Sequence, residues 1–128
     1  MVSEDALLLA IRVQDVIVLD YIHHAWKEVL SKEGLYQRAI KFERVFRNKF
    51  YRPAAAERLR SDLLHDFYLV RLRAARLLAD LGDLTDVGLF FDLIKLPAEQ
   101  FELKSERDFY IEVLRVLAGQ ADKSGLPS

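Results

Sequence analysis

The chain has 128 residues, with 19 lysines and arginines against 20 aspartates and glutamates, so a net charge of −1 gives no whole-chain attraction to nucleic acid or membrane. An apolar content of 52% supports one folded domain and excludes the composition of a disordered chain. The absence of cysteine excludes disulfides, thiolate nucleophiles, iron–sulfur clusters and zinc sites with thiolate ligands.

The first predicted element is one long helix over Ser3–Leu30, which contains neither proline nor glycine. Its apolar residues occupy more than one side, which predicts that the helix is central in the domain or covered by a partner. The run Val16–Leu19 would also suit a short strand, but the chain offers no second strand to pair with it.

The acidic start lacks the basic region of a secretory signal, and no apolar run reaches the roughly 18 residues of a membrane span. We therefore expect a cytoplasmic chain, whether whole or a piece of a longer protein.

Five further helices are predicted from apolar periodicity and from capping residues. They cover Leu35–Phe50, Pro53–His65, Phe67–Leu81, Leu84–Leu96 and a last segment from Ser105 to about Gly119. With six helices, short turns and no credible strand, we expect an all-α domain over residues 1–122. The helices would form antiparallel pairs, and residues 123–128 a flexible tail.

One stretch, from Asp66 to Asp83, resembles a HEAT-like repeat of the bacterial PBS-lyase type. The residues that carry the resemblance are Asp66, Val70, Arg71, Ala74, Ala75, the spaced leucines, and the closing Leu81, Gly82 and Asp83. The two alanines would let neighbouring helices approach closely, Gly82 would allow a left-handed turn, and Asp83 would cap the next helix. The likeness covers residues 59–96, and a weaker copy over 97–119 places Arg107 on Arg71 at a shift of 36 residues.

The resemblance implies a short right-handed stack of helix pairs, with structural roles for Arg71 and Arg107, because the family's arginine ties consecutive repeats to acidic groups. Such proteins are mostly interaction scaffolds, although some relatives handle bilin chromophores and some HEAT-like folds repair DNA.

The sequence has no glycine-rich phosphate loop, no nucleophile motif and no third metal ligand beside Asp20 and His24. We therefore expect no catalytic residue, metal or cofactor. The leading hypothesis is a protein-interaction or scaffold module; a lyase or repair enzyme rests on family analogy alone.

The charge is unevenly distributed along the chain. Between residues 38 and 60 there are eight basic residues and two acidic ones. Six of these basic residues form a candidate surface for an anionic partner or nucleic acid: Arg38, Lys41, Arg44, Arg47, Lys49 and Arg52. The alternative is a solvated helix face whose arginines pair with acidic groups elsewhere in the fold.

The first helix carries more apolar surface than a small bundle covers on one side. If the other five helices bury one face of it, Leu8, Val16 and Leu19 remain near the surface. Such a patch predicts an interface for another protein or for a second copy of the chain. Alternatively, the first helix lies centrally and the other helices wrap around it.

Overall fold

The computed structural model describes residues 4–33, 36–81, 87–97, 99 and 105–123, and these form seven α-helices and no strand. The helices are α1 (Glu4–Val13), α2 (Val16–Glu28), α3 (Tyr36–Arg47), α4 (Arg52–Asp62), α5 (Tyr68–Leu81), α6 (Val87–Ile94) and α7 (Glu106–Lys123). A π-helical turn, η1 (Val29–Glu33), continues α2. The predicted all-α class is therefore confirmed.

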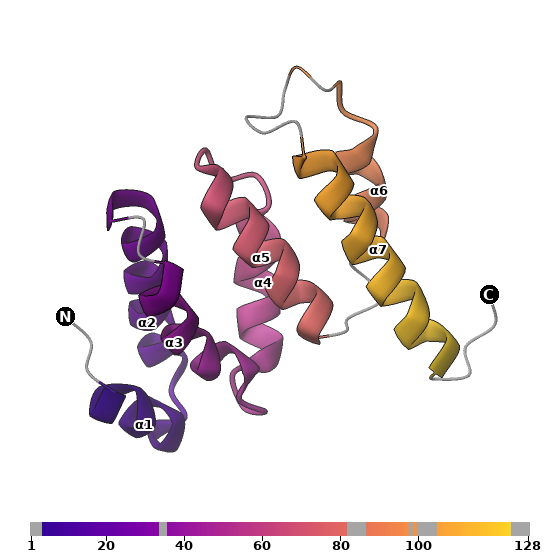
Figure 1. Ribbon diagram of the computed structural model, residues 1–128. Helices are drawn as coiled ribbons and strands as arrows, with labels where there is room; N and C mark the ends of the chain where they lie inside the picture. Colours follow the sequence, from indigo (N-terminus) through magenta and orange to yellow (C-terminus); the bar gives the residue numbers. More distant parts are fainter. Residues whose placement is uncertain (1–3, 34–35, 82–86, 98, 100–104, 124–128) are drawn as a thin grey trace.

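Six of the helices form three consecutive hairpins. The contacts join α2 with α3, α4 with α5, and α6 with α7, and the two helices of each hairpin run in opposite directions (Figure 1). The second helices, α3, α5 and α7, lie side by side in one layer, with α2, α4 and α6 behind them (Figure 1). Helix α5 packs on both α4 and α7, so the middle hairpin holds the other two together.

The predicted single helix over Ser3–Leu30 is wrong, because the chain turns sharply between α1 and α2. Gln14 adopts a left-handed backbone with φ of 55°, and Asp15 is extended. The Asp15 side chain accepts a hydrogen bond from the amide of Ile17 at 2.9 Å, which makes it the N-cap of a new helix.

Tyr51, between α3 and α4, holds this turn in place from 36 positions further along the chain. Its buried hydroxyl donates to the carbonyl oxygen of Ala10 at 2.7 Å and accepts from the amide of Asp15 at 3.0 Å. One side chain thereby satisfies a polar group at the end of α1 and another at the start of α2. These bonds offset the roughly 1 kcal/mol that a left-handed conformation costs a residue other than glycine.

A single connected core runs from Leu7 in α1 to Leu117 in α7. Its largest fully buried side chains include Trp26, Phe46, Tyr51, Phe90 and Tyr110. The last helix continues past Gly119, where we expected it to end, and includes Lys123. The rest of the expected tail lies outside the described residues.

Candidate functional site

Exposed apolar side chains lie on both sides of the turn between α1 and α2. Four side chains are at least half exposed: Leu9 by 60%, Val13 by 50%, Ile17 by 76% and Tyr21 by 64%. They form two pairs four positions apart, one on α1 and one on α2, and residues so spaced share a helix face. We call these four residues the corner surface. Leu8 and Val16, which the sequence predicted to be near the surface, are each 42% exposed beside it.

The prediction that Leu19 also belongs to this interface is wrong, because its side chain is fully buried. Leu8 and Leu19 are about three helical turns apart, so an unbroken helix would place both on one face. The turn at Gln14 removes that phase relationship. As a result Leu19 joins Ile22 and Trp26 on the core side of α2, while Leu8 stays exposed.

Some arginines of the basic segment form ion pairs with acidic groups elsewhere in the fold. Arg47 contacts Asp80 on α5 at 2.9 Å, and Arg58, near the end of the segment, pairs with Asp20 on α2. Arg52 donates to the carbonyl oxygen of Arg47 at 3.2 Å. Of the remaining candidates, Lys41, Arg44 and Lys49 are exposed and Arg38 is half-buried. This pairing lowers the positive charge that the segment can offer to an anionic partner.

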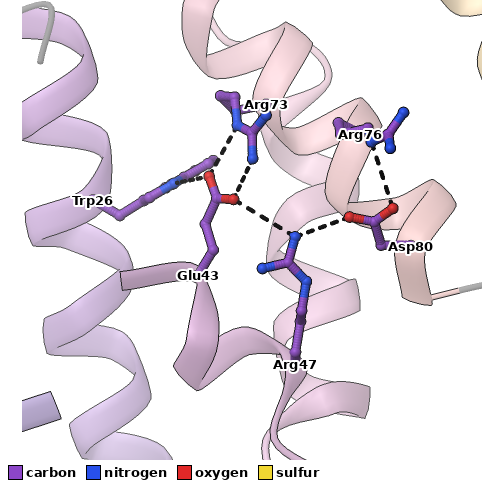
Figure 2. Close-up of polar contacts among 6 residues, drawn as sticks. All are labelled: Trp26, Glu43, Arg47, Arg73, Arg76 and Asp80. Carbon is purple, nitrogen blue, oxygen red and sulfur yellow. Dashed lines mark hydrogen bonds and ion pairs between the residues drawn. The ribbon is translucent and has the colours of Figure 1, made fainter. Parts of the chain in front are cut away.

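Glu43, one of the two acidic residues in that segment, is completely buried and joins three helices. It accepts hydrogen bonds from Trp26 Nε1 on α2 at 3.1 Å and from Arg73 Nε on α5 at 3.0 Å. Figure 2 shows this carboxylate between Trp26 and Arg73, and the guanidinium of Arg47 between Glu43 and Asp80. Glu43 is not among the sites predicted from the sequence, although its spacing from Ala39 and Phe46 places it on the buried stripe of α3.

A second buried carboxylate joins α5 to α7. Glu106, 2% exposed, accepts two hydrogen bonds from Arg71, at 2.8 Å from Nη2 and 3.2 Å from Nε. It also accepts from the Tyr110 hydroxyl at 3.2 Å. Burial acts to lower the pKa of Arg71, but the hydrogen bonds and charge of Glu106 outweigh it and raise that pKa. Burial, followed by the charge of Glu106, raises the pKa of Tyr110.

The other residues of the HEAT-like pattern lie around α5 and its neighbours. Ala74 and Ala75 are fully buried in α5, and Asp66 is exposed just before that helix. Arg107 donates from Nε to the carbonyl oxygen of Ile94 at 2.8 Å, which connects α7 to the end of α6. The predicted turn and cap at Gly82 and Asp83 lie outside the described residues.

His23 pairs with a carboxylate that the sequence did not suggest. Its Nε2 contacts Asp62 of α4, a carboxylate only 4% exposed, and its ring stacks on Trp26. Asp20 and His24, considered above as a pair of metal ligands, instead contact Arg58 and Glu28. Within the described part of the chain, no three histidine, aspartate or glutamate side chains gather as metal ligands would. No helix in that part is long and apolar enough to cross a membrane.

Comparison with known family models, with curated proteins and with solved structures yields no match for this chain. The corner surface consists of exposed apolar side chains, whereas the buried polar groups of Glu43, Glu106 and Asp62 are satisfied by partners within the fold.

Proposed function

We propose that this chain is a protein-binding module of HEAT-like type that docks a partner protein on the corner surface. The observation that carries the proposal is the exposure of Leu9, Val13, Ile17 and Tyr21 on two adjoining helices. Large apolar side chains gathered in this way mark interaction sites on folded proteins, because covering them removes apolar area from water.

The local structure supports a binding role because the surface is held in one shape. Tyr51 fixes the angle between α1 and α2, and Asp15 caps the second helix. A surface that keeps its shape before binding loses less conformational entropy when a partner docks. The module then needs no chemistry of its own, in keeping with the absence of a nucleophile motif or phosphate loop in the sequence.

The test is site-specific photocrosslinking in the cells that make the protein. A benzophenone amino acid replaces Ile17 in one variant and Tyr21 in another. The matched control replaces Leu64, just after α4, which is 77% exposed and therefore just as open to chance collisions. We expect a discrete crosslinked species from positions 17 and 21 and none from position 64.

A double substitution separates binding from folding. The variant that carries both Ile17→Ser and Tyr21→Ser should lose association but keep its thermal stability, because both side chains are mostly in water. Light scattering at several concentrations shows whether the crosslinked species is a second copy of the chain. Equal crosslinking from positions 17, 21 and 64, or association that survives the double substitution, would contradict the proposal.

A further inference from the structure

A separate cleft lies between α5 and α7, in the layer formed by the second helices of the hairpins. Its volume is about 400 Å³, within the range of small-molecule sites. The lining residues are Leu69, Leu72, Arg73, Arg76 and Phe109. All three apolar members are only partly buried, so they remain available to a ligand.

The four lining residues on α5 form a continuous stripe along the helix. Their spacing of three, four and seven positions places them on one face, over a length of about 10 Å. The first two are leucines and the last two are arginines, so the stripe changes from apolar to cationic along its length. An extended segment of about three residues spans the same distance.

Arg76 supplies the cationic end of the cleft. Its side chain is 55% exposed, and its Nε lies 3.5 Å from Oδ1 of Asp80. That carboxylate is also bound, more closely, by Arg47 at 2.9 Å. Figure 2 shows three guanidinium groups sharing the carboxylates of Glu43 and Asp80. Asp80 therefore divides its charge between two arginines, and Arg76 has the longer contact.

We propose that this cleft binds a short segment of a partner protein that carries a carboxylate next to a large apolar side chain. The carboxylate accepts hydrogen bonds from the exposed guanidinium of Arg76, whose planar group of donors matches a carboxylate. The neighbouring apolar side chain packs on Leu72 and Phe109. This site is distinct from the corner surface, and the two can be tested independently.

Arg73 makes the cleft a preformed site. Its guanidinium is held by the buried carboxylate of Glu43, with the side chain 11% exposed. Across α5, Arg71 and Glu106 fix the neighbouring helix that carries Phe109. The spacing of α5 and α7 is thus set by bonds that a ligand does not have to form, which favours binding.

The experiment is selection of a random heptapeptide phage library against the folded chain, followed by fluorescence anisotropy with the selected peptide. We expect enrichment of an acidic residue next to an aromatic or aliphatic one. Arg76→Gln should lower the affinity for the labelled peptide about tenfold, as loss of a charge-assisted hydrogen bond does. Phe109→Ala should lower this affinity as well.

The matched control is Arg115→Gln on α7. Arg115 is an exposed arginine that also pairs with a carboxylate on its own helix, Glu112 at 3.1 Å, but it does not line the cleft. This variant should bind the peptide like the unmodified chain. Ile17→Ser should also bind the peptide like the unmodified chain, because Ile17 belongs to the corner surface and does not line the cleft. Failure of the corner surface to bind a partner would contradict only the function proposed above and would leave the cleft proposal standing.

Three results would overturn the inference. They are a library without enrichment for acidic residues, a selected peptide that Arg76→Gln binds unchanged, and displacement of the peptide by a random RNA oligonucleotide at equal concentration. The last result would assign the cleft to polyanions in general.

Discussion

Arg71 and Arg73 lie two positions apart on α5 and bind buried carboxylates on opposite neighbours. Arg73 reaches Glu43 on α3, and Arg71 reaches Glu106 on α7. Positions two apart on a helix project in nearly opposite directions, so one helix can place an arginine on each side. The middle hairpin is therefore joined to both flanking hairpins by ion pairs as well as by apolar packing.

The pair of Arg71 and Glu106 is expected to matter for stability because both side chains are largely buried, at 13% and 1% exposed. Arg71→Ala leaves the carboxylate of Glu106 without its cation, and the expected loss is about 3 kcal/mol of unfolding free energy. Urea denaturation measures it. Arg115→Ala, which removes an exposed arginine, should change stability by less than about 0.5 kcal/mol.

A double substitution separates the cost of a lone charge from the value of the pair. Arg71→Leu with Glu106→Leu should be more stable than Arg71→Ala alone, because no buried charge is left uncompensated. If Arg71→Ala is no more destabilising than Arg115→Ala, the two residues do not hold α5 and α7 together.

Helix positions could largely be predicted from the sequence, because apolar spacing and capping residues are local signals. The start of α4 beside Pro53 and the extent of α5 are examples, each within two residues of the expectation. The turn at Gln14 could not be predicted in this way. It contains no glycine or proline and depends on hydrogen bonds from Tyr51, which is distant in the sequence.

The candidate surfaces show the same division between local and long-range causes. The exposure of Leu8 and the burial of Leu19 depend on that one turn, so a helix drawn through it put both residues on one face. Likewise, a count of charges finds the basic segment but not the partners of its arginines. Arg47 meets Asp80 only because α3 and α5 lie side by side (Figure 1).

The raised pKa of Tyr110 predicts that the domain loses stability in alkaline solution. In the unfolded chain this phenol ionises near its ordinary value of 10.0, whereas in the folded chain it holds its proton to higher pH. Its contribution to stability is therefore complete below about pH 10 and is lost as the pH rises toward the folded pKa. Over that range the unfolding free energy should fall by up to about 1.4 kcal/mol per pH unit.

Tyr110→Phe is the variant that isolates this effect. It removes the ionisable group, so the fall in unfolding free energy above pH 10 should be shallower than in the unmodified chain. Urea titrations at intervals between pH 8.5 and about 11.5 provide the comparison. Tyr21→Phe serves as the control, since Tyr21 is 64% exposed. Parallel curves for the unmodified chain and Tyr110→Phe would contradict the prediction.

Ala74 and Ala75 are expected to tolerate no larger side chain. Both are fully buried in α5, which packs on α4 and α7. Replacing either by leucine should lower the unfolding free energy by about 1–3 kcal/mol, because added volume in a packed interior forces strain. Thermal unfolding followed by circular dichroism measures the change. Arg76→Leu, at an exposed position of the same helix, should have a much smaller effect, and equal effects at positions 74 and 76 would count against close packing there.

Substitutions of Gln14 should raise or lower the unfolding free energy according to the residue that replaces it. Its φ of 55° lies in the left-handed region, which glycine adopts freely and β-branched residues adopt with most difficulty. The Gln14 side chain is exposed, so a substitution there changes mainly the backbone energy. Gln14→Gly should raise the unfolding free energy by up to about 1 kcal/mol, and Gln14→Val should lower it by about the same amount. Denaturant titration of the three proteins gives the order. If valine proves as stable as glycine at this position, the chain does not turn at Gln14, and α1 and α2 form the single helix that the sequence suggested.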